Sequence, residues 1–208
     1  MEQPQSSKRF PLAGQAKDGF SNENEATATC YCGAVQLKFA ITAPGFVGTF
    51  MCHCSDCRKI TASVITTAFI VRNSHLEHLR GQDNLTIYTQ SSTIASGNDM
   101  SNFFCKTCGT LMYRRGICAP DCSLLRTGTV DDFTLHETVL KPTVENFAEN
   151  RVCWLKELEG ARQYIGQAPL KTNKASIAKL YMVSSFAMRI KPRAANNVYA
   201  SDSGGHSS

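Results

Sequence analysis

Apolar and polar residues alternate along much of the first two thirds of the chain, in short runs that end at turn residues. Within residues 26–41, the apolar side chains recur at every second position at Val35, Leu37, Phe39 and Ile41. A period of two places such side chains on one face of a strand. The pattern therefore predicts a strand with one buried face in this segment, ending before Pro44-Gly45.

Further strands are predicted where β-branched and aromatic residues concentrate between turn signals. They are expected at residues 62–71, 85–89, 102–115 (interrupted by a turn) and 124–130, with a short strand or a turn at 76–79. Many short strands with little helical periodicity indicate a mainly β domain of short antiparallel strands.

One stretch near the end of this domain has a helical pattern. In residues 144–164, Val152, Leu155 and Leu158 are spaced by three residues, with charged side chains between them. This spacing predicts a C-terminal helical segment. Trp154 lies within it and is expected in the core.

Composition divides the chain of 208 residues into three parts. Residues 1–25 are polar without periodicity and are expected to form a disordered tail. Residues 26–165 are predicted to fold as one domain, and residues 166–208 as a basic, mostly disordered tail. No stretch approaches the ~20 apolar residues of a membrane-spanning helix.

The net charge of +5 is concentrated in the C-terminal part. Residues 26–160 carry twelve basic and twelve acidic side chains, whereas residues 161–208 carry seven basic and one acidic. Phosphate binding needs a basic face, so the neutral domain argues against a nucleic-acid groove on its surface. The basic tail keeps a role of its own open.

Ten cysteines are many for an ordinary domain, and they indicate either disulfides or metal. The polar N-terminus has no apolar run typical of a signal peptide. We therefore expect reduced thiols and bound metal in the cytoplasm, with the nucleus as a second location. A disulfide network is the alternative.

Four cysteines are expected to form a closed structural zinc site. Cys30 and Cys32 have the i, i+2 spacing that directs both side chains to one face of a strand. Cys105 and Cys108 have the C-x2-C spacing of a zinc knuckle. Two such pairs supply the four thiolates of a tetrahedral site.

Cys52, Cys54 and Cys57 remain as a separate group of three. Catalytic zinc keeps one coordination position open, so three thiolates predict an open second site. His53 is the rival fourth ligand, although an extended segment would point its ring away from the neighbouring cysteines. Both sites being structural is the alternative to a catalytic one.

An open zinc site with three thiolates favours thiol chemistry over hydrolysis. Three sulfurs donate strongly, so the ion is a weaker Lewis acid than one held by three histidines. A fourth soft ligand suits it, and binding there supplies an incoming thiol as its thiolate. The expected reaction is addition of a small thiol to a carbon electrophile, or the reverse.

Several motifs resemble the family of glutathione-dependent formaldehyde-activating enzymes, which is grouped with centromere protein V. The resembling segments are Cys30-Tyr-Cys-Gly-Ala-Val35, Cys52-His-Cys-Ser-Asp-Cys-Arg-Lys59, Phe104-Cys-Lys-Thr-Cys-Gly-Thr110, Gly128-Thr-Val-Asp-Asp132, Pro142 and Arg151-Val-Cys-Trp-Leu155. The resemblance covers roughly residues 26–160 and implies a zinc-bound Mss4-like (β-tent) fold.

The resemblance also implies ligands and an activity. The implied metal ligands are Cys30, Cys32, Cys105 and Cys108 for the structural zinc, and Cys52, Cys54 and Cys57 for the catalytic zinc. The implied reaction is that of a carbon–sulfur lyase, in which glutathione as co-substrate and formaldehyde interconvert with S-(hydroxymethyl)glutathione.

Glutathione is anionic and needs cationic partners. Arg58, Arg114 and Arg115 lie near the metal motifs and are the candidate glutathione contacts, since bidentate arginine suits carboxylates. The alternative function is a non-catalytic, zinc-stabilised module whose basic tail binds a protein or nucleic acid.

Overall fold

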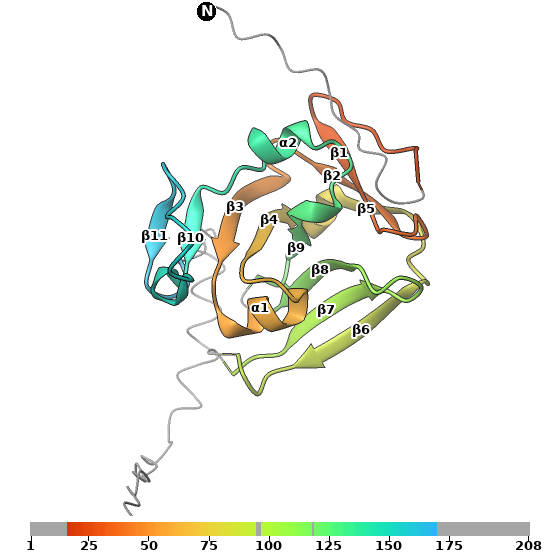
Figure 1. Ribbon diagram of the computed structural model, residues 1–208. Coiled ribbons are helices and arrows are strands. Elements are labelled where there is room, and N and C mark those ends of the chain that lie inside the picture. Colours follow the sequence, from red (N-terminus) through yellow and green to blue (C-terminus); the bar gives the residue numbers. More distant parts are fainter. Residues whose placement is uncertain (1–15, 95–96, 118, 170–208) are drawn as a thin grey trace, which may run out of the picture. The chain divides into compact units, whose positions relative to one another are not determined.

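The computed structural model describes residues 16–94, 97–117 and 119–169, and this part of the chain is mainly β (Figure 1). The strands are β1 (Glu25–Thr29), β2 (Gln36–Ala40), β3 (Phe46–Cys52), β4 (Thr66–Arg72), β5 (Leu76–Arg80), β6 (Leu85–Gln90), β7 (Met100–Cys105), β8 (Leu111–Gly116), β9 (Cys122–Arg126), β10 (Val144–Asn146) and β11 (Arg162–Tyr164). The helices are α1 (Ser55–Thr61), α2 (Thr134–Glu137) and the 3-10 turns η1 (Asn73–His75), η2 (Thr127–Thr129) and η3 (Ala148–Asn150).

The strands form two sheets. The smaller sheet has the order β1-β2-β5, and the larger has the order β11-β10-β3-β4-β9-β8-β7-β6. All pairings are antiparallel except those of β10 with β3 and with β11, which are parallel. Helix α1 connects β3 to β4 at one end of the larger sheet (Figure 1).

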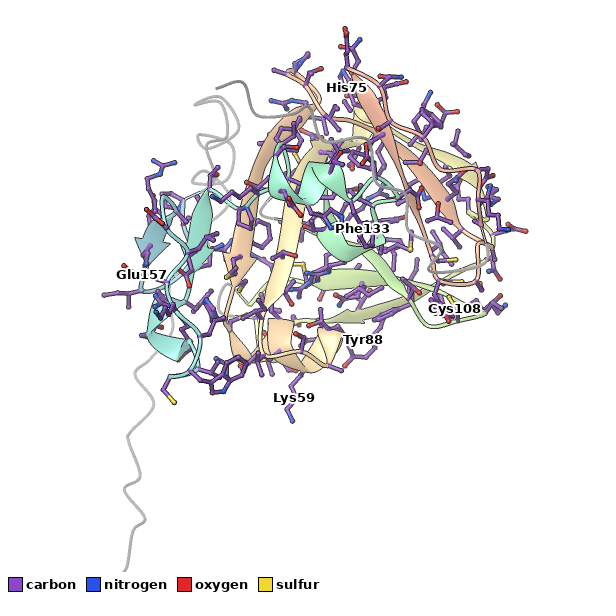
Figure 2. All side chains as sticks on the ribbon, turned by 45° about the horizontal axis from the view of Figure 1, so that its top comes forward. Lys59, His75, Tyr88, Cys108, Phe133 and Glu157 are labelled. Atoms are coloured by element: carbon purple, nitrogen blue, oxygen red, sulfur yellow. The ribbon has the colours of Figure 1, made fainter. Side chains whose placement is uncertain are left out.

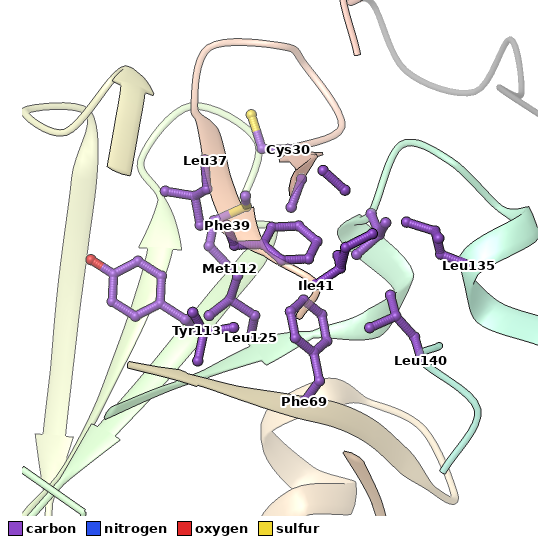
Figure 3. Packing of buried hydrophobic residues seen from close by; sticks show 14 of the residues in the cluster. Cys30, Leu37, Phe39, Ile41, Phe69, Met112, Tyr113, Leu125, Leu135 and Leu140 are labelled. Atoms are coloured by element: carbon purple, nitrogen blue, oxygen red, sulfur yellow. The ribbon is translucent and has the colours of Figure 1, made fainter. Parts of the chain in front are cut away.

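The main core lies between the two sheets (Figure 3). Phe39 of β2 contacts Phe69 of β4, with ring centroids 4.7 Å apart, and both side chains are fully buried. Tyr113 of β8 stacks on Phe103 of β7 at 4.4 Å. The inward faces of both sheets are thus apolar. The opposite face of the larger sheet carries polar side chains such as Arg114.

The predicted alternation in residues 26–41 is confirmed on its apolar side: Val35, Leu37, Phe39 and Ile41 are all buried. The segment is, however, a hairpin and not one strand. β1 pairs with β2 from Glu25↔Ala40 to Thr29↔Gln36, and a turn joins them. Gly33 occupies this turn with φ of +80°, a conformation that favours glycine.

Residues 16–24, which the sequence analysis placed in the N-terminal tail, contact the domain in the structure. Asp18 forms an ion pair with Arg80 of β5, and the Arg80 guanidinium lowers the pKa of this carboxyl. The backbone N–H of Phe20 donates to Thr27 Oγ1 at 2.9 Å. Contacts with the domain therefore begin before β1, within residues 16–24.

The predicted helix at residues 144–164 is wrong. This stretch contains β10, η3 and β11, because β10 pairs with β3 through Glu145↔Met51 and Asn146↔Cys52. Trp154 is 69% exposed and does not lie in the core. Such non-local strand pairing cannot be deduced from local apolar spacing.

Among the described residues, no helix is long and apolar enough to span a membrane. Cys118, residues 1–15 and residues 170–208, including almost all of the basic tail, lie outside the described residues. The alternative of a module that acts through this tail therefore concerns residues outside the described part of the chain.

Candidate metal centres

Two segments that are distant in sequence bring four cysteines together. Cys30 and Cys32 lie in the turn after β1, and Cys105 and Cys108 lie at the end of β7 and in the turn that follows. Their four sulfurs all lie within 4.8 Å of one another. The C-x-C pair is thus presented by a turn and not, as expected, by one face of a strand.

The spacing of these sulfurs fits a tetrahedral ion. Cys30 Sγ and Cys32 Sγ are 3.6 Å apart, and Cys32 Sγ and Cys105 Sγ are 3.7 Å apart. Tetrahedral zinc with bonds of about 2.3 Å places its sulfurs about 3.8 Å apart. The donor set and its dimensions therefore suit a structural zinc ion.

Surrounding N–H groups also point at these sulfurs. The Val35 backbone N–H donates to Cys30 Sγ at 3.2 Å, and Asn84 Nδ2 donates to Cys105 Sγ at 3.5 Å. Burial raises the pKa of Cys30 to about 12. Burial also acts to raise the pKa of Cys108, but hydrogen bonds with Thr110 and Cys32 together outweigh it and lower this pKa to about 6. Four neighbouring thiols cannot all ionise without a cation, so the cluster could hold a metal ion that stabilises its thiolates.

The second cluster is built at the junction of β3 and α1. Cys52 is the last residue of β3, Cys54 is the N-cap of α1 and Cys57 lies in its first turn. The three sulfurs lie within 4.8 Å of one another, and no fourth histidine, cysteine or carboxylate of the described residues belongs to the group. We refer to Cys52, Cys54 and Cys57 as the triad.

The backbone N–H of Cys57 donates to Cys54 Sγ at 3.4 Å. This sulfur is therefore both the N-cap acceptor of α1 and a candidate metal ligand. Hydrogen bonds with Cys52 and Cys57 lower the pKa of Cys54 to about 2. Hydrogen bonds with Cys54 and Cys57 instead raise the pKa of Cys52. One thiolate in the triad thus suppresses ionisation of a neighbour. A divalent cation would remove this conflict and stabilise three thiolates together.

His53 is not the fourth donor. Its ring is fully buried, and Nε2 lies 2.7 Å from Glu145 Oε1 of β10. The same carboxylate oxygen accepts a hydrogen bond from Arg151 Nε at 2.9 Å. The backbone N–H of His53 donates to the carbonyl of Asn146 at 3.1 Å. This histidine therefore fastens the triad segment to β10.

The substitution Glu145→Gln tests this attachment. We expect the free energy of unfolding to fall by about 2 kcal/mol, because a buried acceptor shared by His53 and Arg151 loses its charge. Chemical denaturation measures the change, and Glu149→Gln, at an exposed position, is the matched control. Equal stability of the two variants would show that the contact between His53 and Glu145 does not fasten the triad segment to β10.

The three candidate glutathione contacts lie in different surroundings. Arg114 is buried, and its Nη1 donates to Cys57 Sγ at 3.7 Å. Arg115 lies on the opposite face of β8, where its Nε donates to Ser123 Oγ at 2.9 Å and its guanidinium covers the Tyr113 ring. Arg58 of α1 donates to the carbonyl of Asn150. Arg114 thus brings its side chain to a triad sulfur, whereas Arg58 contacts the triad through its backbone N–H, which donates to the Cys54 carbonyl at 3.1 Å.

The neighbouring Lys59 side chain points outward from α1 (Figure 2). It is exposed, so it is free of the packing that fixes Arg114.

Arg126 was not identified from the sequence, yet it lies beside the triad. It ends β9 and is only 6% exposed. Burial lowers the pKa of Arg126 to about 10, while the charges of Cys57 and Cys52 oppose this shift, so the side chain stays protonated at neutral pH. The available sequence signal was a basic residue inside the apolar run Leu124-Leu-Arg-Thr127.

A cavity of about 510 Å³ adjoins this region. Its lining includes Arg126, Thr66 of β4, and Thr110 and Leu111 from the segment after the zinc knuckle. Thr66 Oγ1 donates to the Cys57 carbonyl at 3.2 Å, which places one wall of the cavity against the triad helix. The volume is that of a small-molecule site.

A larger groove of about 910 Å³ lies elsewhere on the surface, between residues 22–25, residues 42–44 and His75. Neither cavity is lined by a cluster cysteine, but the smaller one is lined by Thr61 and Thr66, whose hydroxyl groups donate to the Cys57 carbonyl, whereas no described residue that lines the larger makes such a contact. Proximity to the triad, and not size, therefore identifies the cavity of interest.

The family to which the chain is similar agrees with the cysteine pattern. The family model described as "Glutathione-dependent formaldehyde-activating enzyme" matches residues 25–150, which include both cysteine clusters. The chain is also similar to a Rhodobacter sphaeroides protein of known crystal structure, with 28% sequence identity and a TM-score of 0.40. The alignment covers 50% of this chain and 85% of the Rhodobacter sphaeroides chain. No curated protein matches the chain.

Proposed function

The chain belongs to the family of glutathione-dependent formaldehyde-activating enzymes, and from this premise we propose that it is a zinc-dependent carbon–sulfur lyase or synthase. It would join a small thiol such as glutathione to an aldehyde such as formaldehyde, and would catalyse the reverse reaction. The new bond is between sulfur and the carbonyl carbon. The carbonyl π bond breaks, and the proton of the thiol ends on the oxygen.

The triad is the observation that carries this proposal. Three cysteine sulfurs lie within 4.8 Å of one another, with no fourth donor side chain among the described residues. When bound there, zinc would supply a soft cationic site with one open position, at which a thiol is stabilised as its thiolate. The four-cysteine cluster has no such vacancy and would serve stability.

The chain's own residues orient the triad. Cys52 is fixed at the end of β3 by the pairing of β10, and Cys54 is fixed as the N-cap of α1. The carbonyl of Cys57 accepts hydrogen bonds from Thr61 Oγ1 at 2.7 Å and Thr66 Oγ1 at 3.2 Å. Rigid attachment on three sides keeps the sulfurs converged, as a site that acts through geometry requires.

The cavity of about 510 Å³ would receive the remainder of the thiol. Its threonines offer hydroxyl partners to peptide groups, and Arg126 offers positive charge. All cysteines of the described residues are unpaired thiols, so we expect the protein to act in a reducing compartment such as the cytosol.

Exchange NMR with ¹³C-formaldehyde and glutathione tests the proposal, because the adduct forms without a catalyst and only its exchange rate reports catalysis. We expect the zinc-loaded chain to raise the exchange rate above the protein-free background. A panel of other small aldehydes then defines the electrophile. Exchange at the background rate with every aldehyde would refute the proposed activity.

A further inference from the structure

Two buried arginines adjoin the triad without a carboxylate partner among the described residues. Arg114 and Arg126 are 8% and 6% exposed. Arg114 Nε, Arg126 Nε and Arg126 Nη2 are buried and have no hydrogen-bond partner within the described part of the chain. Cys57 Sγ accepts a hydrogen bond from Arg114 Nη1, but it leaves these other nitrogen atoms without a partner. Buried charges are normally paired, so the two guanidinium groups together indicate a further anion beside the triad.

The sheet explains why both arginines reach the same place. β8 and β9 are neighbours, with Arg114 opposite Leu124. Arg126 is two residues after Leu124 and therefore shares its face, whereas Leu125 between them faces the main core. The face turned away from the core thus carries two cations next to Cys57.

Charge counting specifies the missing partner. Three thiolates and one divalent zinc ion carry a net charge of about −1, and two guanidinium groups add about +2. The buried site then has an excess of one positive charge, which a monoanionic ligand cancels and a neutral ligand does not. Low dielectric makes such an imbalance costly.

We propose that Arg114 and Arg126 make the triad selective for an anionic fourth ligand, a thiolate, over neutral ligands. This inference rests on the proposed function, since it requires the open position. It assigns the two arginines as specificity-determining residues that act through their fixed charge. The electrostatic match would favour binding of the thiol in its reactive form.

The test uses the full chain loaded with cobalt in place of zinc, and reads ligand binding from the sulfur-to-metal absorption bands. Two probes are titrated: 2-mercaptoethanol, which is charged only as its thiolate, and imidazole, which binds as a neutral molecule. Arg126→Gln should weaken 2-mercaptoethanol binding by about tenfold or more. Imidazole affinity should stay the same or rise.

Further variants separate charge from folding. Arg126→Lys keeps the charge and should retain most of the thiol affinity, and Arg114→Gln should repeat the selective loss if Arg126→Gln does not fold. Arg72→Gln, which removes an exposed cation from β4, is the matched control and should change neither affinity.

The outcomes are distinct. An unchanged ratio of thiol to imidazole affinity in both glutamine variants would overturn this inference alone. If the unaltered chain binds neither probe, there is no open position, and both the inference and the proposed function fail.

Discussion

Replacing Cys105 by serine is expected to abolish the native fold or leave it only marginally stable. Cys105 is 1% exposed and holds one corner of the four-cysteine cluster, which joins the β1–β2 turn to the β7–β8 turn. Structural zinc contributes roughly 10–16 kcal/mol of apparent binding free energy. That is comparable to the whole stability of a domain, about 5–15 kcal/mol.

Thermal unfolding and zinc content measure this effect. We expect Cys105→Ser to lose the cooperative transition and to bind at most one zinc ion per chain. Cys122→Ser is the control, because Cys122 is buried but belongs to neither cluster, and it should cost only about 1–3 kcal/mol. Native stability of Cys105→Ser would show that the cluster is no structural centre.

Replacing Cys54 by serine should remove activity while preserving the fold. Cys54 is the N-cap of α1, and its sulfur accepts a hydrogen bond from the Cys57 N–H. Serine is among the best N-cap residues, so the helix keeps its cap. The triad, however, loses a thiolate, and we expect the catalysed exchange of the thiol adduct to fall by about a hundredfold or more.

The matched control is Cys153→Ser, at an exposed cysteine that belongs to neither cluster. It should keep both the exchange rate and the stability of the unaltered chain. Full turnover in Cys54→Ser, with its fold intact, would contradict a catalytic role of the triad.

The cysteine clusters were predictable because their spacing is local. C-x-C, C-x-C-x2-C and C-x2-C assign seven sulfurs to two groups, and the structure brings together the same two groups. The strand prediction also held wherever a period of two was clear, as at Leu37 and Phe39. Cysteine spacing within a motif and the apolar period of a strand both depend only on residues that are close in sequence.

The predictions that were wrong concern residues whose conformation or burial depends on contacts with segments distant in sequence. The spacing of Val152, Leu155 and Leu158 fits a helix, but these residues lie in the irregular segment between η3 and β11. The two ends of the stretch are strands, since β10 pairs with β11 and with β3, about ninety residues earlier. Glu145 would ordinarily be read as exposed, yet it is fully buried because His53 and Arg151 bind it. The buried partners of a charged residue are not local in sequence.

Arg126 was not predicted for the same reason, because its neighbours in the structure are distant in sequence. A single arginine in a strand is usually at the surface, and only the alignment of β8, β9 and α1 places it beside Cys57. Arg114 and Arg115 were both predicted as glutathione contacts from their position near the metal motifs, but strand alternation directs these two side chains to opposite faces. Sequence proximity to a metal motif therefore identified Arg114 but missed Arg126, the second buried cation beside the triad.

One of the two zinc ions is expected to have only three protein sulfurs, so that an outside thiol completes its coordination shell. X-ray absorption at the zinc edge measures this directly on the full chain with two zinc ions bound. The two clusters predict an average of about 3.5 sulfurs per zinc without added thiol, rising to about 4 with glutathione. An average that does not change on adding glutathione would contradict the account.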